Sequence, residues 1–167
     1  MLRDNQHAHD GRIAAMRVLL AIDGSGHSDA AVDAVVRRHL EAGSEVRVIS
    51  VLETSYWPVA FPGDGWDMTL YVEIERAARE RAQAAVDGAA ATLRADGESR
   101  HVHVTADVLS GSAKRTILEE ADAFGADVIV VGSHGHGHFE RFRLGSVSHA
   151  VALNASCSVE IVRHPTK

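Results

Sequence analysis

Hydrophobic and polar positions alternate along the chain in a way that predicts strands and helices in turn. Five short segments are rich in apolar residues, either as continuous runs or in alternation with polar residues, and this is typical of strands. These segments lie at residues 17–22, 46–52, 101–109, 127–131 and 159–163. Longer segments between them carry apolar residues three or four positions apart, which is the spacing of one helix face. The pattern therefore predicts five strands separated by helices.

Serine and glycine residues mark the expected ends of these helices. Ser28 is a good N-cap for the first helix, because its hydroxyl can accept a hydrogen bond from an unpaired backbone N–H, and Gly43 is expected to end that helix. A longer helix should run from about Asp67 to near Gly97, and a third should stop at Gly125. The residues expected on one face are Ala31, Val32, Val35, Val36, His39 and Leu40 in the first helix, Tyr71, Ile74, Ala78, Ala82, Ala85, Ala89 and Leu93 in the second, Ala113, Ile117, Ala121 and Phe124 in the third, and Val147, Ser148, Ala150, Val151 and Leu153 in the last.

Repeated strand–helix alternation predicts an α/β fold: an open parallel sheet of five strands with helices on both faces. The 167 residues are enough for one domain with a single core, expected at residues 16–165. Residues 1–15 carry charges and histidines without an apolar pattern, so we expect a flexible leader there. Residues 53–66 combine aromatic residues with proline and glycine, which predicts a long loop of the kind that often has a function.

Composition and charge narrow the possible partners and the compartment. The chain is 46% hydrophobic and 24% charged, with a formal net charge of -6. That balance argues against nucleic acid or an anionic membrane surface as a partner. No apolar run approaches the roughly 20 residues that a membrane helix needs. Cys157 is the only cysteine, which excludes an intramolecular disulfide and fits a reducing compartment such as the cytoplasm.

One segment combines glycine spacing with a strand and a helix start. Gly132-Ser133-His134-Gly135 follows the apolar strand, and Gly145-Ser146 comes nine residues later at the beginning of the last helix. Glycines can adopt positive φ and bring backbone N–H groups against a ligand, and a helix N-terminus favours an anion. This arrangement suits a polyphosphate. The alternative is a tight strand-to-helix connection that needs small residues and binds nothing.

The sequence Gly-x-x-Gly, nine residues, Gly-Ser resembles the ATP-binding signature of the universal stress protein family, over roughly residues 16–163. The resemblance implies a Rossmann-like, adenine nucleotide α-hydrolase-like sheet with strand order 3-2-1-4-5. It also implies ATP as ligand, with Mg²⁺ or Mn²⁺ carried on its phosphates, a regulatory role in the stress response, and a homodimer paired through the strand at 159–163. Ser158 and Glu160 depart from the proline and apolar residue usual in the family, which bears on the dimer geometry.

Carried onto this sequence, the resemblance assigns roles to individual residues. Asp23 would contact the nucleoside, with a ribose as its hydrogen-bond partner; its alternative role is an Asx-turn or helix cap. Backbone contacts to the ligand are expected at Gly132, Ser133, His134 and Gly135. Ala21, Ile22, Val51 and Val131 match positions that line the adenine slot, although plain core packing explains Val51 and Val131 equally well. Phosphate contacts are expected at Gly145, Ser146, Val147 and Ser148, and Arg141 and Arg143 could reach the phosphate tail.

Two further readings compete with nucleotide binding alone. His134, His136 and His138 share one side of an extended loop and could converge on a metal, with Glu140 nearby. Slow ATP hydrolysis is conceivable with Asp23 activating water, but neither a Lys-bearing phosphate loop nor a Gly-x-Ser-x-Gly elbow is present. A receiver domain is disfavoured, because Asp107 lacks the acidic pair and the lysine expected to accompany it. The sequence therefore favours binding over catalysis.

Overall fold

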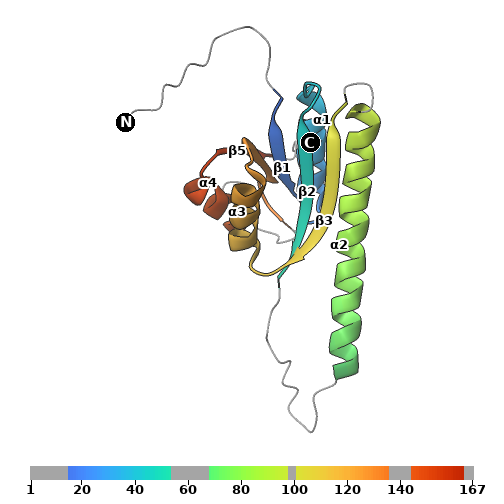
Figure 1. Cartoon of the computed structure of the whole chain (residues 1–167). Helices are drawn as coiled ribbons and strands as arrows, with labels where there is room; N and C mark the ends of the chain where they lie inside the picture. Colours follow the sequence, from blue (N-terminus) through green and yellow to red (C-terminus); the bar gives the residue numbers. More distant parts are fainter. Residues whose placement is uncertain (1–14, 54–67, 98–100, 136–143, 164–167) are drawn as a thin grey trace.

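A computed structural model describes residues 15–53, 68–97, 101–135 and 144–163. Its centre is a five-stranded sheet in which every neighbouring pair is parallel, in the order β3-β2-β1-β4-β5 (Figure 1). The predicted fold class and strand order are confirmed. The strands are β1 (Arg17–Ala21), β2 (Glu45–Leu52), β3 (His103–Ser110), β4 (Val128–Gly132) and β5 (Ser158–Val162).

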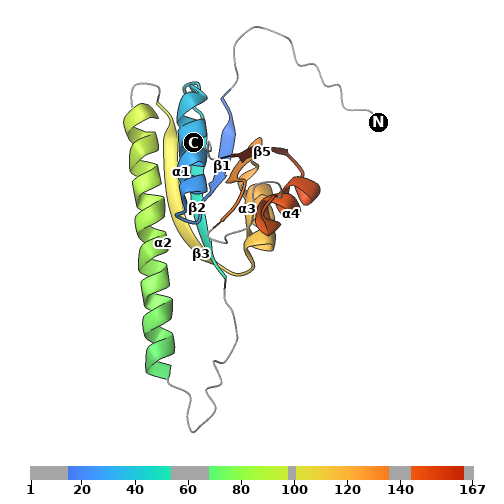
Figure 2. The same cartoon turned by 180° about the vertical axis from the view of Figure 1, so that it is seen from behind.

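In the described parts of the chain, four helices cover the sheet, two on each face. They are α1 (Gly26–Arg37), α2 (Met68–Gly97), α3 (Ala113–Phe124) and α4 (Ser146–Asn154). Figures 1 and 2 show α1 and α2 on one face and α3 and α4 on the other. Among the described residues no helix is both long and apolar enough to cross a membrane.

The core consists of two apolar layers separated by the sheet. Three consecutive residues of β1, Val18, Leu19 and Leu20, are all fully buried. Val18 and Leu20 pack under α1 and α2, whereas Leu19 packs under α3 and α4. Successive strand residues point to opposite faces, so a central strand covered on both sides must be apolar throughout. This explains why the sequence of β1 shows a continuous apolar run.

The boundaries of α1 differ from those predicted. The N-cap is Ser25, three residues before the predicted cap Ser28, and the helix ends at Arg37 rather than at Gly43. His39 has a φ of 49° and is exposed, so it does not belong to the buried face of a helix. The chain therefore leaves the helix early, through a left-handed residue that is not glycine.

The predicted apolar stripe of α2 is only half buried. Ala82, Ala89 and Leu93 pack into the core, as the spacing indicated, whereas Ile74 is 56% exposed. The helix has 30 residues, and its N-terminal end extends beyond the end of the sheet (Figure 1). The inward positions of α3 are as predicted for Ile117 and Ala121, and the helix stops at Gly125 with a φ of 68°.

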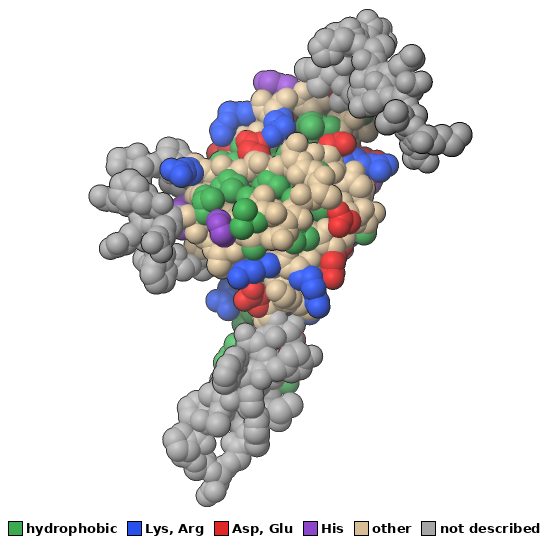
Figure 3. Space-filling model, turned by 90° about the vertical axis from the view of Figure 1, so that its left-hand side faces the viewer, with side chains coloured by type: hydrophobic (Ala, Val, Ile, Leu, Met, Phe, Trp, Pro, Cys, Tyr) green, Lys and Arg blue, Asp and Glu red, His purple; other side chains and the backbone are tan. Residues whose placement is uncertain are grey.

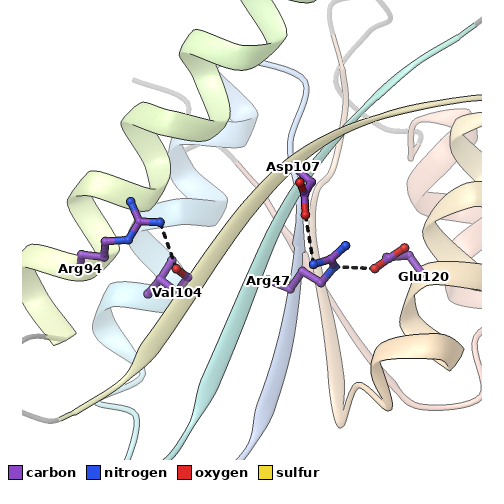
Figure 4. Close-up of polar contacts among 5 residues, drawn as sticks. All are labelled: Arg47, Arg94, Val104, Asp107 and Glu120. Atoms are coloured by element: carbon purple, nitrogen blue, oxygen red, sulfur yellow. Dashed lines mark hydrogen bonds and ion pairs between the residues drawn. The ribbon is translucent and has the colours of Figure 1, made fainter.

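Arginine side chains tie the β2–β3 side of the sheet to neighbouring helices (Figure 4). Arg47 on β2 bonds to Asp107 on β3 at 3.1 Å and to Glu120 on α3. Arg94 on α2 donates to the carbonyl of Val104, 3.0 Å away, on the edge strand β3. A covered acceptor at a sheet edge is less available for pairing with another strand.

Candidate functional site

The carboxyl ends of β1 and β4 lie side by side in the middle of the sheet, where the strand order reverses. From β1 the chain passes to α1 on one face, and from β4 it continues toward α4 on the other face (Figures 1 and 2). Loops diverging in this way leave a crevice above the strand ends, which is where open α/β sheets bind ligands. The loops that carry the predicted site residues therefore lie at the position in the sheet where this class of fold binds ligands.

Asp23 follows β1, and its carboxylate is held in one orientation by the start of α1. The backbone N–H of Ser25 donates to Oδ1 at 3.0 Å, and the Ser28 hydroxyl donates to the same oxygen at 2.6 Å. In return the Ser28 Oγ accepts the backbone N–H of Asp23 at 2.9 Å. Ser28 is buried, whereas Asp23 is exposed. The Asp23 carboxylate is thus accessible to solvent, and hydrogen bonds from Ser25 and Ser28 fix its orientation.

The role of Ser28 is not the one that the sequence suggested. Its hydroxyl closes a ring with Asp23 instead of capping α1, and Ser25 at the N-cap makes no side-chain capping bond. The available signal was the spacing of an Asp and a Ser five residues apart across a glycine turn. That spacing lets a serine in the first helical turn reach back to the preceding loop.

Two of the spaced glycines allow the loops after β1 and β4 to touch. A Cβ on Gly135 would lie 2.5 Å from Oδ2 of Asp23. A Cβ on Gly132 would lie 3.0 Å from both the Cβ and the carbonyl oxygen of His27, in the first turn of α1. Neither glycine has a φ in the left-handed region, so the need is for space and not for an unusual backbone conformation.

Gly145 and Ser148 fasten the start of α4 to the end of β4. The carbonyl of Ser133 accepts the N–H of Gly145 at 2.8 Å and the hydroxyl of Ser148 at 3.1 Å. A Cβ on Gly145, whose φ is −60°, would lie 3.1 Å from that carbonyl oxygen. The N–H of Ser133 donates to Val162 at 2.7 Å. The backbone of Ser133 and the hydroxyl of Ser148 are therefore engaged within the protein.

The first turn of α4 remains the best-placed anion-binding element of the site. Ser146 lies in this first turn, as predicted, and is exposed. N–H groups in the first turn of a helix have no intrahelical acceptor, and the helix dipole favours negative charge there. Arg141 and Arg143 lie outside the described residues. Ser146 and the N–H groups of this turn are thus the candidates for phosphate contacts.

The four apolar residues assigned to an adenine slot do not share one face. Ala21, Val51 and Val131 pack with the core under α3 and α4. Ile22 packs under α1 and α2 and is 7% exposed. Val131 is 3% exposed, which is the core packing that the sequence also allowed. A base bound near the strand ends would therefore contact the residues on the α3–α4 side of the sheet more readily than it would contact Ile22, which lies on the other side.

Each loop contains a buried polar atom that has no hydrogen-bond partner among the described residues. One is the hydroxyl oxygen of Ser25, and the other is Nε2 of His134. The imidazole of His134 lies against that of His27, with ring centroids 5.3 Å apart, and its Nδ1 is 3.2 Å from the Ser133 hydroxyl. Sequence reasoning missed Ser25 and His27, because only the fold brings α1 against the glycine loop. Polar atoms left unpaired in this way are costly, and a ligand with donors and acceptors would satisfy them.

A metal site has no support in the described part of the chain. Those residues contain no group of three or more His, Cys, Asp or Glu side chains that could hold an ion. His136 and His138, which the metal hypothesis needs together with His134, lie outside the described residues. The predicted leader at 1–15 also lies outside the described residues, apart from residue 15. The same holds for the predicted loop at 53–66, apart from residue 53.

Comparison with known proteins relates the whole domain to one family. The model of the universal stress protein family matches residues 15–163. Universal stress protein A homolog 1 of Coxiella burnetii is 30% identical over 142 residues, which cover 85% of this chain and 92% of that protein. Among solved structures, universal stress protein UspA from Lactobacillus plantarum has a TM-score of 0.70 at 22% identity, covering 91% of this chain and all of that one.

Two similar structures contain an adenine nucleotide. An Arabidopsis thaliana universal stress protein family protein with AMP bound has a TM-score of 0.59 at 18% identity, and covers 90% of this chain and 93% of its own. A universal stress protein in complex with cAMP has a TM-score of 0.51 at 25% identity, and covers 90% of this chain and 98% of its own.

Proposed function

The chain belongs to the universal stress protein family, and from this premise we propose that it binds ATP at the carboxyl ends of β1 and β4 and acts as a nucleotide-dependent regulatory module of the stress response. Mg²⁺ or Mn²⁺ would accompany the nucleotide on its phosphates, because such ions need few protein ligands there. With a single cysteine, the chain suits a cytoplasmic setting.

One observation carries the proposal: the fixed carboxylate of Asp23 stands where two loops meet, and each loop holds a buried polar atom without a partner among the described residues. A carboxylate with this orientation suits the adjacent hydroxyls of a ribose, since an ionised acceptor makes strong hydrogen bonds. The α4 N-terminus lies against the loop after β4, since a Cβ on Gly145 would be 3.3 Å from the Cα of His134, and its N–H groups would bind phosphates. Similar structures with AMP and cAMP support an adenine nucleotide as the ligand class.

The number of phosphates can be tested directly on the protein as purified. Mass spectrometry of small molecules released on denaturation should detect an adenine nucleotide. Calorimetry with ATP, AMP and cAMP, with and without Mg²⁺, should then rank their affinities, with ATP the tightest. Release of inorganic phosphate during a long incubation would identify slow hydrolysis. An absence of heat with all three nucleotides would refute the proposal.

The role of Asp23 predicts a specific loss. Asp23→Ala should weaken ATP binding by about 1–3 kcal/mol, the usual contribution of hydrogen bonds to a charged group, and should erase discrimination against 2′- or 3′-deoxy-ATP. Asp87→Ala is the matched control, because Asp87 is exposed on α2 and its carboxylate bonds, within the described parts of the chain, only to Gln83, at 3.0 Å. Equal discrimination in wild type and Asp23→Ala would remove Asp23 from the site.

We further propose a homodimer that pairs through β5. In a parallel strand, alternate residues direct both backbone groups to the same side. Ser158 and Val162 bond toward β4, so Val159 and Ile161 direct their N–H and C=O groups to the outer edge of the sheet. The face seen in Figure 3, the side of the molecule where α4 and β5 lie in Figure 1, gathers hydrophobic side chains at its centre with charged side chains around them.

Glu160 does not stand in the way of this pairing. Its carboxylate is bound by Arg38 at the end of α1, so it points across a face of the sheet and not along its edge. The predicted effect of Glu160→Val on the dimer is therefore small. Light scattering should give the mass of a dimer at micromolar concentration, and a monomer throughout that range would refute the pairing.

A further inference from the structure

The imidazole of His134 lies half-buried in the loop after β4, and its two nitrogens differ in their surroundings. Nδ1 lies 3.2 Å from the hydroxyl oxygen of Ser133, whereas Nε2 is buried and has no hydrogen-bond partner among the described residues. The ring packs against that of His27, with centroids 5.3 Å apart. A neutral imidazole carries its hydrogen on only one nitrogen, so the bond made by Nδ1 decides whether Nε2 is a donor or an acceptor.

The surroundings of Ser133 place this hydrogen on Nε2. Ser133 is 2% exposed, and among the described residues its hydroxyl bonds only to Nδ1 of His134. Its own carbonyl already accepts bonds from Gly145 and Ser148. A buried O–H without an acceptor is costly, so the Ser133 hydroxyl donates to Nδ1. Nε2 then carries the hydrogen of the neutral ring and is a donor that no described residue satisfies.

His134 lies between the first turns of two helices that cover opposite faces of the sheet (Figures 1 and 2). His27, which its ring contacts, is the second residue of α1. A Cβ on Gly145, the N-cap of α4, would be 3.3 Å from the Cα of His134. The dipoles of both helices favour negative charge at their N-termini. A donor in this position therefore suits an anionic oxygen better than a neutral acceptor.

The carboxylate of Asp23 does not supply that oxygen. Its Oδ1 accepts bonds from Ser25 and Ser28, and its Oδ2 lies against Gly135, while Nε2 of His134 has no partner among the described residues. The acceptor therefore comes from outside these residues. Among the groups of ATP, the phosphates are the ones that combine negative charge with strongly accepting oxygens. A phosphate oxygen is thus the partner that fits both the donor and its position.

We propose that His134 determines the preference of the site for a phosphorylated ligand: its Nε2–H donates to a phosphate oxygen, and Ser133 positions this donor by fixing the tautomer. The inference rests on the proposed nucleotide site, and it adds a side-chain contact to the backbone contact expected for His134. On binding, a buried donor without a partner gains a hydrogen bond to a charged acceptor, which is stronger than a bond between neutral groups. His134 then contributes to the binding of ATP but not of adenosine, which has no phosphate.

Calorimetry with ATP and with adenosine separates this contact from the rest of the site. His134→Phe keeps a flat ring against His27 without the N–H, and His134→Leu removes both; each should weaken ATP binding by about tenfold or more and adenosine binding by less than about twofold. His134→Gln retains a side-chain N–H and should bind ATP within about threefold of the wild type. His103→Leu is the matched control, because His103 is exposed at the amino end of β3, and it should bind both ligands as the wild type does. Thermal melts without ligand verify that each variant is folded.

Nitrogen NMR of the nucleotide-free protein tests the tautomer independently of binding. The neutral ring of His134 should carry its hydrogen on Nε2, and Ser133→Ala should reduce this preference and weaken ATP binding more than adenosine binding. A hydrogen on Nδ1 in the wild type would overturn the inference. So would a folded His134→Phe or His134→Leu that binds ATP as the wild type does, or that loses ATP and adenosine affinity equally; in these cases the nucleotide site itself would stand. Wild-type protein that binds no nucleotide would instead refute the proposed function, and this inference with it.

Discussion

The ring of hydrogen bonds between Asp23 and Ser28 predicts a measurable loss of stability in Ser28→Ala. The hydroxyl is buried and makes two bonds, one donated to the Asp23 carboxylate at 2.6 Å and one accepted from the Asp23 N–H at 2.9 Å. Alanine removes both and leaves the N–H without its acceptor. The carboxylate keeps the Ser25 N–H, 3.0 Å away, and remains open to water.

The magnitude follows from these contacts. A buried group that loses its partner costs about 1–3 kcal/mol, and the bond of the Asp23 N–H is partly buried, so we expect a central value of about 2 kcal/mol. For a domain of this size about 2–4 °C of melting temperature corresponds to each kcal/mol, which gives a fall of about 4–8 °C. Thermal and urea unfolding without nucleotide measure it.

Ser25→Ala is a matched control one turn away. The Ser25 hydroxyl is also buried but has no partner among the described residues and makes no capping bond, so its removal should leave the melting temperature within about 2 °C of wild type or raise it. With nucleotide present, the melting temperature of Ser25→Ala should fall further below that of the wild type, because a ligand that bonds the Ser25 hydroxyl loses that bond in this variant. Equal destabilisation of the two variants without ligand would refute the assigned roles.

Two more predictions concern stability alone. Gly145→Ala should destabilise the protein by about 1–3 kcal/mol, because its Cβ would press on the Ser133 carbonyl. Gly88→Ala should stabilise it by about 0.5–1 kcal/mol, because alanine has the higher helix propensity. Urea titration measures both, and changes in stability of the same sign would contradict the prediction. Arg47→Met should lower the free energy of unfolding by about 1–3 kcal/mol, less than for a fully buried pair, since the side chains of Arg47 and Glu120 are 24% and 22% exposed. Adding Glu120→Met should recover part of this loss. A double variant that loses more stability than the two single changes summed would contradict the prediction.

The sheet was predictable because its pattern follows from burial alone. Residues 18–20 are excluded from water on both faces of the sheet, and a central strand that is covered on both sides requires such a run. Helix ends were less predictable. Gly43 is a plausible stop, yet α1 ends at Arg37, where a left-handed His39 turns the chain. Histidine adopts this conformation more often than most non-glycine residues do, but its presence at residue 39 does not by itself mark the end of a helix.

The candidate site shows the same division between local and tertiary information. The meeting of Asp23 with Gly135 follows from two loops at adjacent strand ends, and the strand order that the family resemblance implied already placed these ends side by side. The engagement of Ser148 with the Ser133 carbonyl and the packing of His27 against His134 do not follow from spacing. They depend on the angle at which α4 and α1 approach the sheet, and that angle is set by the whole core.

The glycines at 132, 135 and 145 illustrate why a motif and its physical cause must be separated. Each makes room for part of the protein itself, and none has a left-handed φ, so their spacing by itself records two loops closed tightly against each other. Tight closure alone would favour pairing every buried polar atom. The loops instead leave Ser25 Oγ and His134 Nε2 without partners in the described chain, on either side of the contact with Asp23. These unpaired atoms, and not the glycine spacing, are therefore what a ligand would satisfy, and the glycines would hold the two loops in place for it.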